Sequence, residues 1–303
     1  MDATNIGRRA AAGAAALALA AGLTVAPGGP AHAGGFAPVR VEQVSDSDDS
    51  TTKTATATCP GARSVFAAGA RVVNGDGGVV LTAMVPNPEL TSVTVTAKAR
   101  TGHAGDWSLT AYATCDTSTS PPKRTAVTVN WASTAQVSCP DDTRVVGTGF
   151  RFEGSVDHTY VDEVAFGPGL RDVRVHTGGD AEPASLTAFG ICKEPTGPTG
   201  VRVNASSAYD GSWPKAAVTD DPGPDLHVYA VGARVVGSGE FFLSALVPNS
   251  SLRLAGAEAV QASQLPGAAG TGDAGRAGGA DTGADGDGDG SLTVSGLLMA
   301  AFH

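Results

Sequence analysis

Residues 59–73 read CPGARSVFAAGARVV, and residues 139–153 read CPDDTRVVGTGFRFE. In both stretches a valine stands six residues after the cysteine, a glycine ten residues after it and an arginine twelve residues after it. A third stretch, VGARVV at 231–236, nearly duplicates AGARVV at 68–73. Agreement at several fixed offsets in three places indicates a threefold internal repeat.

The repeat extends beyond these openings to whole units of the chain. The motif VPN with a leucine four residues after its proline stands at 85–90 and again at 247–252. The first two units close on SLTAYATC (108–115) and SLTAFGIC (185–192), and the third closes on SLTV (291–294). Lead-in segments also recur, and we align them as VRV at 39–41, VTV at 127–129 and VRV at 201–203.

The pattern inside a unit is that of β-strands. Thr54, Thr56 and Thr58 alternate with alanines, and such a period of two predicts half-buried antiparallel strands. Turn-forming residues at 74–78 and 102–105 separate the strands. We therefore expect an all-β fold with four or five strands per unit. Because each unit is too small to bury a core alone, the three should share one about a pseudo-threefold axis. This is a β-prism-like arrangement, and a β-trefoil or tandem β-sandwiches are the alternatives.

The Cys-Pro…Val…Gly opening and the Thr-Ala-Tyr-Ala-Thr-Cys closing resemble repeats of secreted bacterial (actinomycete-type) proteins of unassigned function. The architecture is similar in outline to β-prism proteins such as the vitelline membrane outer layer type. The resemblance implies a fold and carries no active site with it.

The N-terminus has the features of a secretory signal peptide. Arg8 and Arg9 precede an Ala/Leu run at 10–25, and Ala31-His32-Ala33 supplies small residues for cleavage. We expect cleavage after Ala33, which predicts a secreted, extracellular protein with no stable membrane anchor. The general secretory route is the default, and the arginine pair leaves the twin-arginine route open.

The domain organisation follows from the signal and the repeat. We expect a signal peptide at 1–33, a flexible N-terminal segment at 34–54 and one β-repeat domain at 55–303. Within that domain the units should span about 55–115, 127–192 and 201–303. Residues 266–290 are almost entirely Gly, Ala, Asp and Thr, which predicts a disordered insertion inside the third unit.

All four cysteines lie in the repeats. Cys59 and Cys115 open and close the first unit, Cys139 and Cys192 do so in the second, and the third has lost both positions. Joint presence and joint loss predict within-unit disulfides, Cys59–Cys115 and Cys139–Cys192, in an oxidising compartment.

The charge balance argues against nucleic acid as a partner. The chain carries 20 Lys and Arg against 30 Asp and Glu, and it contains no basic stripe. Binding to a phosphate backbone requires clustered cations, so nucleic-acid binding is not expected. The sequence leaves the oligomeric state open.

One segment has the spacing of calcium ligands. Asp285, Asp287 and Asp289 alternate with glycines, as at the start of a calcium-binding loop. The twelfth position is Gly296 rather than a glutamate, so the site would be weak, and a solvated acidic loop is the alternative. Calcium is the one cofactor that we consider.

The sequence offers no specific catalytic motif. It has no G-x-S-x-G elbow, and its histidines lack metal-ligand spacing. Asp162 and Glu163, beside Tyr160, could serve as glycosidase carboxylates, although adjacent charges on a strand edge are the commoner explanation. We expect a non-catalytic protein, with a secreted hydrolase of unrecognised site as an alternative.

Five aromatic residues are candidates for stacking on sugars: Trp107, Trp131, Tyr160, Tyr209 and Trp213. Their other role would be to cap the shared core. The expected function is therefore binding of an extracellular or cell-wall ligand such as carbohydrate, and a purely structural envelope role is the remaining alternative.

Overall fold

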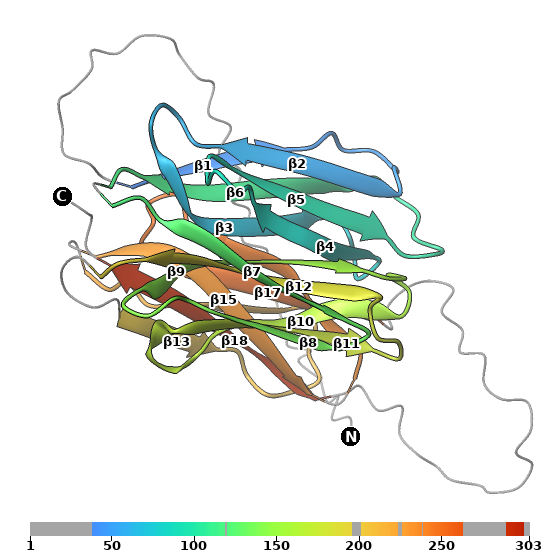
Figure 1. The fold of residues 1–303 in the computed structure, drawn as a ribbon. Helices are drawn as coiled ribbons and strands as arrows, with labels where there is room; N and C mark the ends of the chain where they lie inside the picture. The colour runs from blue at the N-terminus through green and yellow to red at the C-terminus, as the bar shows by residue number, and fades with distance from the viewer. Residues whose placement is uncertain are drawn as a thin grey trace, which may run out of the picture. The chain divides into compact units, whose positions relative to one another are not determined.

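The computed structural model describes residues 38–118, 120–195, 201–223, 226–237, 239–262 and 289–299. This part of the chain contains eighteen β-strands and one short 3-10 helix, η1 (Pro168–Leu170) (Figure 1).

Each unit supplies six strands, not the four or five expected. The first unit comprises β1 (Val39–Val44), β2 (Thr52–Thr58), β3 (Ser64–Val73), β4 (Val79–Pro86), β5 (Ser92–Ala99) and β6 (Ser108–Asp116). The second comprises β7 (Lys123–Asn130), β8 (Thr134–Ser138), β9 (Arg144–Glu153), β10 (Thr159–Phe166), β11 (Asp172–Gly179) and β12 (Ser185–Lys193). The third comprises β13 (Val201–Ser206), β14 (Lys215–Val218), β15 (His227–Gly237), β16 (Phe241–Pro248), β17 (Ala255–Gln261) and β18 (Gly290–Met299).

The strands form three antiparallel sheets of six strands, and every sheet is shared by two units. The strand orders are β1-β6-β3-β16-β17-β14, β7-β12-β9-β4-β5-β2 and β13-β18-β15-β10-β11-β8. Each unit gives its first, sixth and third strands to one sheet and its fourth, fifth and second strands to the next. The all-β fold with three repeats about a pseudo-threefold axis is therefore confirmed. Tandem β-sandwiches are excluded, because no unit owns a sheet.

Units meet at a short seam in the middle of each sheet, and the repeated glycine makes this contact possible. The paired residues are Arg71 with Ala245, Arg151 with Ala83 and Arg234 with Glu163, each followed by one further pair. Gly69, Gly149 and Gly232 lie beside these pairs. A Cβ atom on them would lie 2.7, 2.5 and 2.6 Å from a carbonyl oxygen of the neighbouring unit's strand. Only glycine allows so close an approach of two backbones.

A second seam contact comes from an arginine in each lead-in strand. Arg40, Arg124 and Arg202 donate to the carbonyl oxygens of Pro248, Pro86 and Phe166 at 2.8, 2.9 and 3.0 Å. The middle lead-in is therefore Lys123-Arg124-Thr125, which pairs with the end of β12. Our alignment of VTV at 127–129 with the other two lead-ins is wrong, because the arginine rather than the valines is the shared feature.

The expectation of a flexible segment at 34–54 is wrong for residues 39–44 and 52–54. Residues 52–54 begin β2, and residues 39–44 form β1, which pairs with β6 from Val39–Cys115 to Val44–Thr110. As an edge strand, β1 turns Glu42 and its neighbours toward solvent. The polar composition typical of a flexible segment belongs to residues 45–50, whereas β1 reads VRVEQV and its backbone is hydrogen-bonded to β6.

The interior is built from the inward residues of all three sheets. Phe66, Val146 and Tyr229 occupy corresponding bulges in β3, β9 and β15, and all three are buried. Phe66 and Tyr229 pack edge to face with ring centroids 5.5 Å apart. The Tyr229 hydroxyl donates at 2.5 Å to buried Asp116, so one polar pair links the first unit to the third inside the core.

The structure pairs Cys59 with Cys115 and Cys139 with Cys192, the within-unit arrangement expected from the repeat. In the third unit, Asp221 stands six residues after Lys215, as Cys59 stands six residues after Lys53, and so takes the place of the first cysteine. The Arg253 guanidinium donates to Asp221 Oδ1 at 2.7 and 3.1 Å. This ion pair joins the end of β14 to the start of β17, so it ties together neighbouring strands rather than the ends of the unit.

Two predicted segments cannot be compared with the fold. The signal peptide at 1–33 lies outside the described residues, as does all of the 266–290 insertion except its last two residues. Among the residues that the structure describes, no helix is long and apolar enough to cross a membrane.

Candidate functional site

The five candidate aromatic residues divide into buried and exposed sets. Trp107 and Tyr160 are buried, with 0% and 4% of their surface exposed, so they serve the core. Trp213 stacks on Phe241, with ring centroids 4.0 Å apart and planes inclined by 14°. Trp131 and Tyr209 are 71% and 61% exposed. Only these last two present most of a ring to solvent.

Trp131 occupies the turn between β7 and β8, in an unusual backbone conformation. Its φ angle is +51°, in the left-handed region that favours glycine and asparagine. The Trp131 amide donates to Ala184 O at 3.4 Å, which fixes the turn against the start of β12. A bulky residue here costs backbone energy, and an exposed indole returns none of it through burial. Strain of this kind, kept without a packing benefit, is typical of functional positions.

Tyr209 stands at the corresponding place in the third unit. Thr128 pairs with Thr187 and Ser206 pairs with Thr293, so Thr128 and Ser206 occupy the same position in their strands. Trp131 and Tyr209 each follow that position by three residues. The first unit has Ser47 at the equivalent place. Two of the three units therefore carry an exposed aromatic ring after the lead-in strand.

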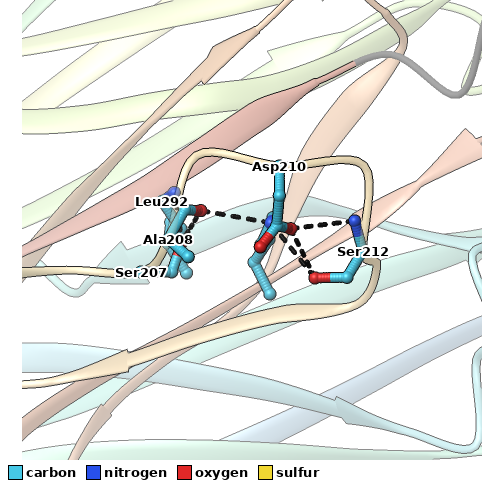
Figure 2. Close-up of polar contacts among 6 residues, drawn as sticks. Ser207, Ala208, Asp210, Ser212 and Leu292 are labelled. Carbon is cyan, nitrogen blue, oxygen red and sulfur yellow. Dashed lines mark hydrogen bonds and ion pairs between the residues drawn. The ribbon is translucent and has the colours of Figure 1, made fainter.

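A compact set of hydrogen bonds closes the turn that contains Tyr209, and Figure 2 labels Ser207, Ala208, Asp210, Ser212 and Leu292 in it. Ser207 and Leu292 are joined by two hydrogen bonds, from Ser207 N to Leu292 O at 2.9 Å and from Leu292 N to Ser207 Oγ at 3.0 Å. Asp210 accepts from Ser212 N at 2.9 Å and forms an ion pair with the buried Lys215 ammonium. Lys215 also donates to Ala208 O at 3.1 Å. These hydrogen bonds, led by that of Lys215, hold the pKa of Asp210 below its usual range.

The first unit contains the same loop, built by Ser45, Asp48, Ser50 and Lys53 at identical spacing. In both loops the lysine lies over an indole, 5.0 Å from Trp107 for Lys53 and 5.4 Å from Trp213 for Lys215. Because the loop recurs in two units, we interpret it as a structural device. Sequence reasoning missed it, although the signal S-x-x-D-x-S-x-x-K stands at 45–53 and at 207–215.

The solvent-facing side of the sheet β13-β18-β15-β10-β11-β8 carries a charge cluster that the other two sheets lack. Glu163 lies between two guanidiniums, with Arg174 Nε 3.8 Å from its Oε1 and Arg234 Nε 3.5 Å from its Oε2. Asp162, at a bulge in β10, contacts His176 Nδ1 at 2.7 Å. This hydrogen bond raises the pKa of His176. Ala83 and Ala245 replace Glu163 at the other two seams.

This cluster contains the two carboxylates considered for catalysis. The Glu163 carboxylate is engaged with two arginines, and that of Asp162 with an imidazole. Tyr160 is not their partner, because its ring packs against Phe242 with centroids 5.5 Å apart. No hydroxyl among the described residues hydrogen-bonds to the other nitrogen of His176.

The calcium candidate falls largely outside the described residues. Asp285 and Asp287 lie outside them, and Asp289 is exposed just before β18. Within the described ranges, no group of three or more His, Cys, Asp or Glu side chains could hold a metal ion.

No protein-family model and no curated protein sequence matches this chain.

Proposed function

We propose that this is a secreted, non-catalytic protein that binds an extracellular or cell-wall glycan, with the Trp131 ring as the principal contact and Tyr209 as a second platform. The observation that carries the proposal is Trp131 itself. The residue is 71% exposed and its backbone is left-handed, two costs that the fold does not recover.

Sugar rings suit such a surface. An indole presents a flat apolar face that stacks against the C–H face of a pyranose, while neighbouring polar groups take up the hydroxyls. Asn130 and Ser133 flank Trp131 in its turn. At the Tyr209 turn, Asp210 and Ser212 supply similar groups. Two platforms at equivalent places would also bring avidity on a polymeric ligand.

The test is a glycan array and a cell-wall pulldown with the full-length chain, both disulfides formed. We expect binding to a restricted set of glycans, and Trp131→Ala should weaken it by about tenfold. Val127→Ala is the matched control, because Val127 lies on β7 and is exposed but has no ring. Absence of wild-type binding in both assays would refute the proposal. Recovery of shortened glycan after incubation would refute the part of it that calls the protein non-catalytic.

A second variant separates binding from stability. Trp131→Asn removes the ring and places at φ +51° a residue that tolerates the left-handed region. We expect its unfolding free energy to be unchanged or to rise by about 1 kcal/mol, while binding falls as in Trp131→Ala. A marked loss of stability would mean that Trp131 serves the fold.

A further inference from the structure

We propose that the outer face of the sheet β13-β18-β15-β10-β11-β8 contains an anion site, in which Arg174 and Arg234 together bind a carboxylate or phosphate group of the glycan. This inference rests on the proposed function and makes it more specific: the ligand is an acidic polymer rather than a neutral one.

The geometry is that of a pair of guanidiniums held apart by one carboxylate. Glu163 is nearly buried, with 8% of its side chain exposed, and each of its oxygens faces a different arginine. The Arg174 and Arg234 side chains are 46% and 59% exposed. Neither has another protein partner among the described residues, so most of their N–H donors face solvent. Glu163 is thus a positioning residue that holds the two guanidinium groups side by side. Their N–H donors then suit the oxygens of a carboxylate or phosphate group.

The charge balance of this seam differs from that of its two counterparts. Arg71 has one glutamate of its own, Glu258, at 2.8 Å, and Arg151 has Glu153 at 3.8 Å. Only at the Glu163 seam do two arginines share one carboxylate, with Asp162 and His176 paired to each other beside them.

The arginine pair lies on the same sheet as the strand that follows Trp131. Trp131 precedes β8, the edge strand of the same sheet, and Thr134 of β8 pairs with His176. His176 pairs with Glu163, and Glu163 pairs with Arg234. From β8 to β15 the row crosses three interstrand spacings, or roughly 14 Å. A linear polymer stacked on Trp131 can therefore run across the strands to the arginines. Beyond them, Ser206 and Thr293 offer hydroxyls.

The experiment measures affinity for charged and neutral forms of the same polymer by calorimetry. The probes are oligogalacturonate with its fully methyl-esterified form, and poly(glycerol phosphate) with glycerol oligomers as its neutral counterpart. Whichever charged probe binds identifies carboxylate or phosphate as the source of the anion. Arg174→Gln and Arg234→Gln should each lower affinity for that probe by about 10- to 100-fold. Arg151→Gln, at the equivalent seam, is the control and should leave affinity unchanged.

The outcomes separate this inference from the proposed function. Tighter binding of a charged probe that declines with salt and with either arginine variant supports the anion site. Equal affinity for charged and neutral probes overturns it, as does wild-type affinity in both arginine variants. If Trp131→Ala still weakens binding in that case, the glycan-binding proposal stands without the anion site. If no probe binds and the glycan array is also empty, both proposals fail.

Discussion

Replacing Gly149 by alanine tests the most specific structural claim, that the repeated glycine exists for contact between units. The added Cβ would lie 2.5 Å from Met84 O and 2.8 Å from Pro86 Cδ, both in the neighbouring unit's β4, and 3.4 Å from Phe189 Cβ. The first two separations are shorter than van der Waals contact. The nearest obstacle is backbone, which cannot rotate away as a side chain can.

The expected cost follows from this geometry. Overpacking in a close-packed interior destabilises proteins by about 1–3 kcal/mol, and a backbone obstacle places Gly149→Ala near the upper end. For a domain of this size, about 3 kcal/mol corresponds to a fall in Tm of roughly 6–12 °C. Gly69→Ala and Gly232→Ala meet carbonyl oxygens at similar distances and should behave alike.

Gly256→Ala is the matched control. Gly256 also lies in a strand, β17, but its added Cβ would meet Val247 O at 3.6 Å and Val218 Cγ2 at 3.8 Å, which are ordinary contacts. We expect its stability to be unchanged or to rise by up to about 1 kcal/mol, because alanine restricts the unfolded chain. The assay is urea denaturation followed by circular dichroism. If Gly149→Ala and Gly256→Ala unfold at the same midpoint as the wild type, the reasoning about the seam is wrong.

Three further perturbations test other parts of the fold. Replacing Cys139 and Cys192 together by serine should lower the unfolding free energy by about 4 kcal/mol in the chain-entropy model; an unchanged denaturation midpoint would contradict this. Burial raises the pKa of Asp116, although the Tyr229 hydroxyl opposes the shift. The stabilisation that protonated Asp116 contributes is therefore complete below its pKa in the unfolded chain, near 3.8. It is lost as pH rises through the pKa of Asp116 in the folded protein. Asp116→Asn should remove this dependence, whereas Asp116→Ala should cost about 1–3 kcal/mol by removing the side-chain oxygen that accepts from the Tyr229 hydroxyl; equal denaturation curves for the two variants would argue against the pair. His176 has a raised pKa, so its stabilising contribution is complete below 6.5 and is lost as pH rises through the folded value. An NMR titration should show the His176 pKa returning toward 6.5 in Asp162→Asn, and an unmoved pKa would exclude this hydrogen bond as the cause.

Much of the fold could be predicted because periodicity and repetition are local signals. Alternation at Thr54, Thr56 and Thr58 corresponds to β2, whose burial alternates residue by residue. The lead-in of the middle unit was harder to predict. Residues 127–129 resemble the other lead-ins in composition, but they pair with a different part of the closing strand. Only the reach of Arg124 to Pro86 O identifies the equivalent residues. Residues 39–44 form an edge strand, and only the adjoining residues 45–50 have the polar, acidic composition of a flexible segment.

The candidate site was predictable only in part. Five aromatic residues were candidates, but sequence does not tell a ring in the core from a ring in solvent when both follow a strand. Trp107 and Trp131 differ by 71 percentage points in exposure because one faces the interior and the other occupies an outward turn. Asp162 and Glu163 were visible as neighbouring charges, whereas their partners Arg174, His176 and Arg234 come from β11 and β15.

By itself, the sequence determined the all-β character, the three units and the cysteines that open and close the first two, because each is written in residues close together or at fixed offsets. The tertiary structure decided that each sheet is shared by two units. The close contact between units explains why each repeat has a glycine at that position. It also decided which rings face solvent and that two arginines from different units meet on Glu163. These features depend on contacts between residues far apart in the chain, whose partners are set by strand order and register rather than by local pattern.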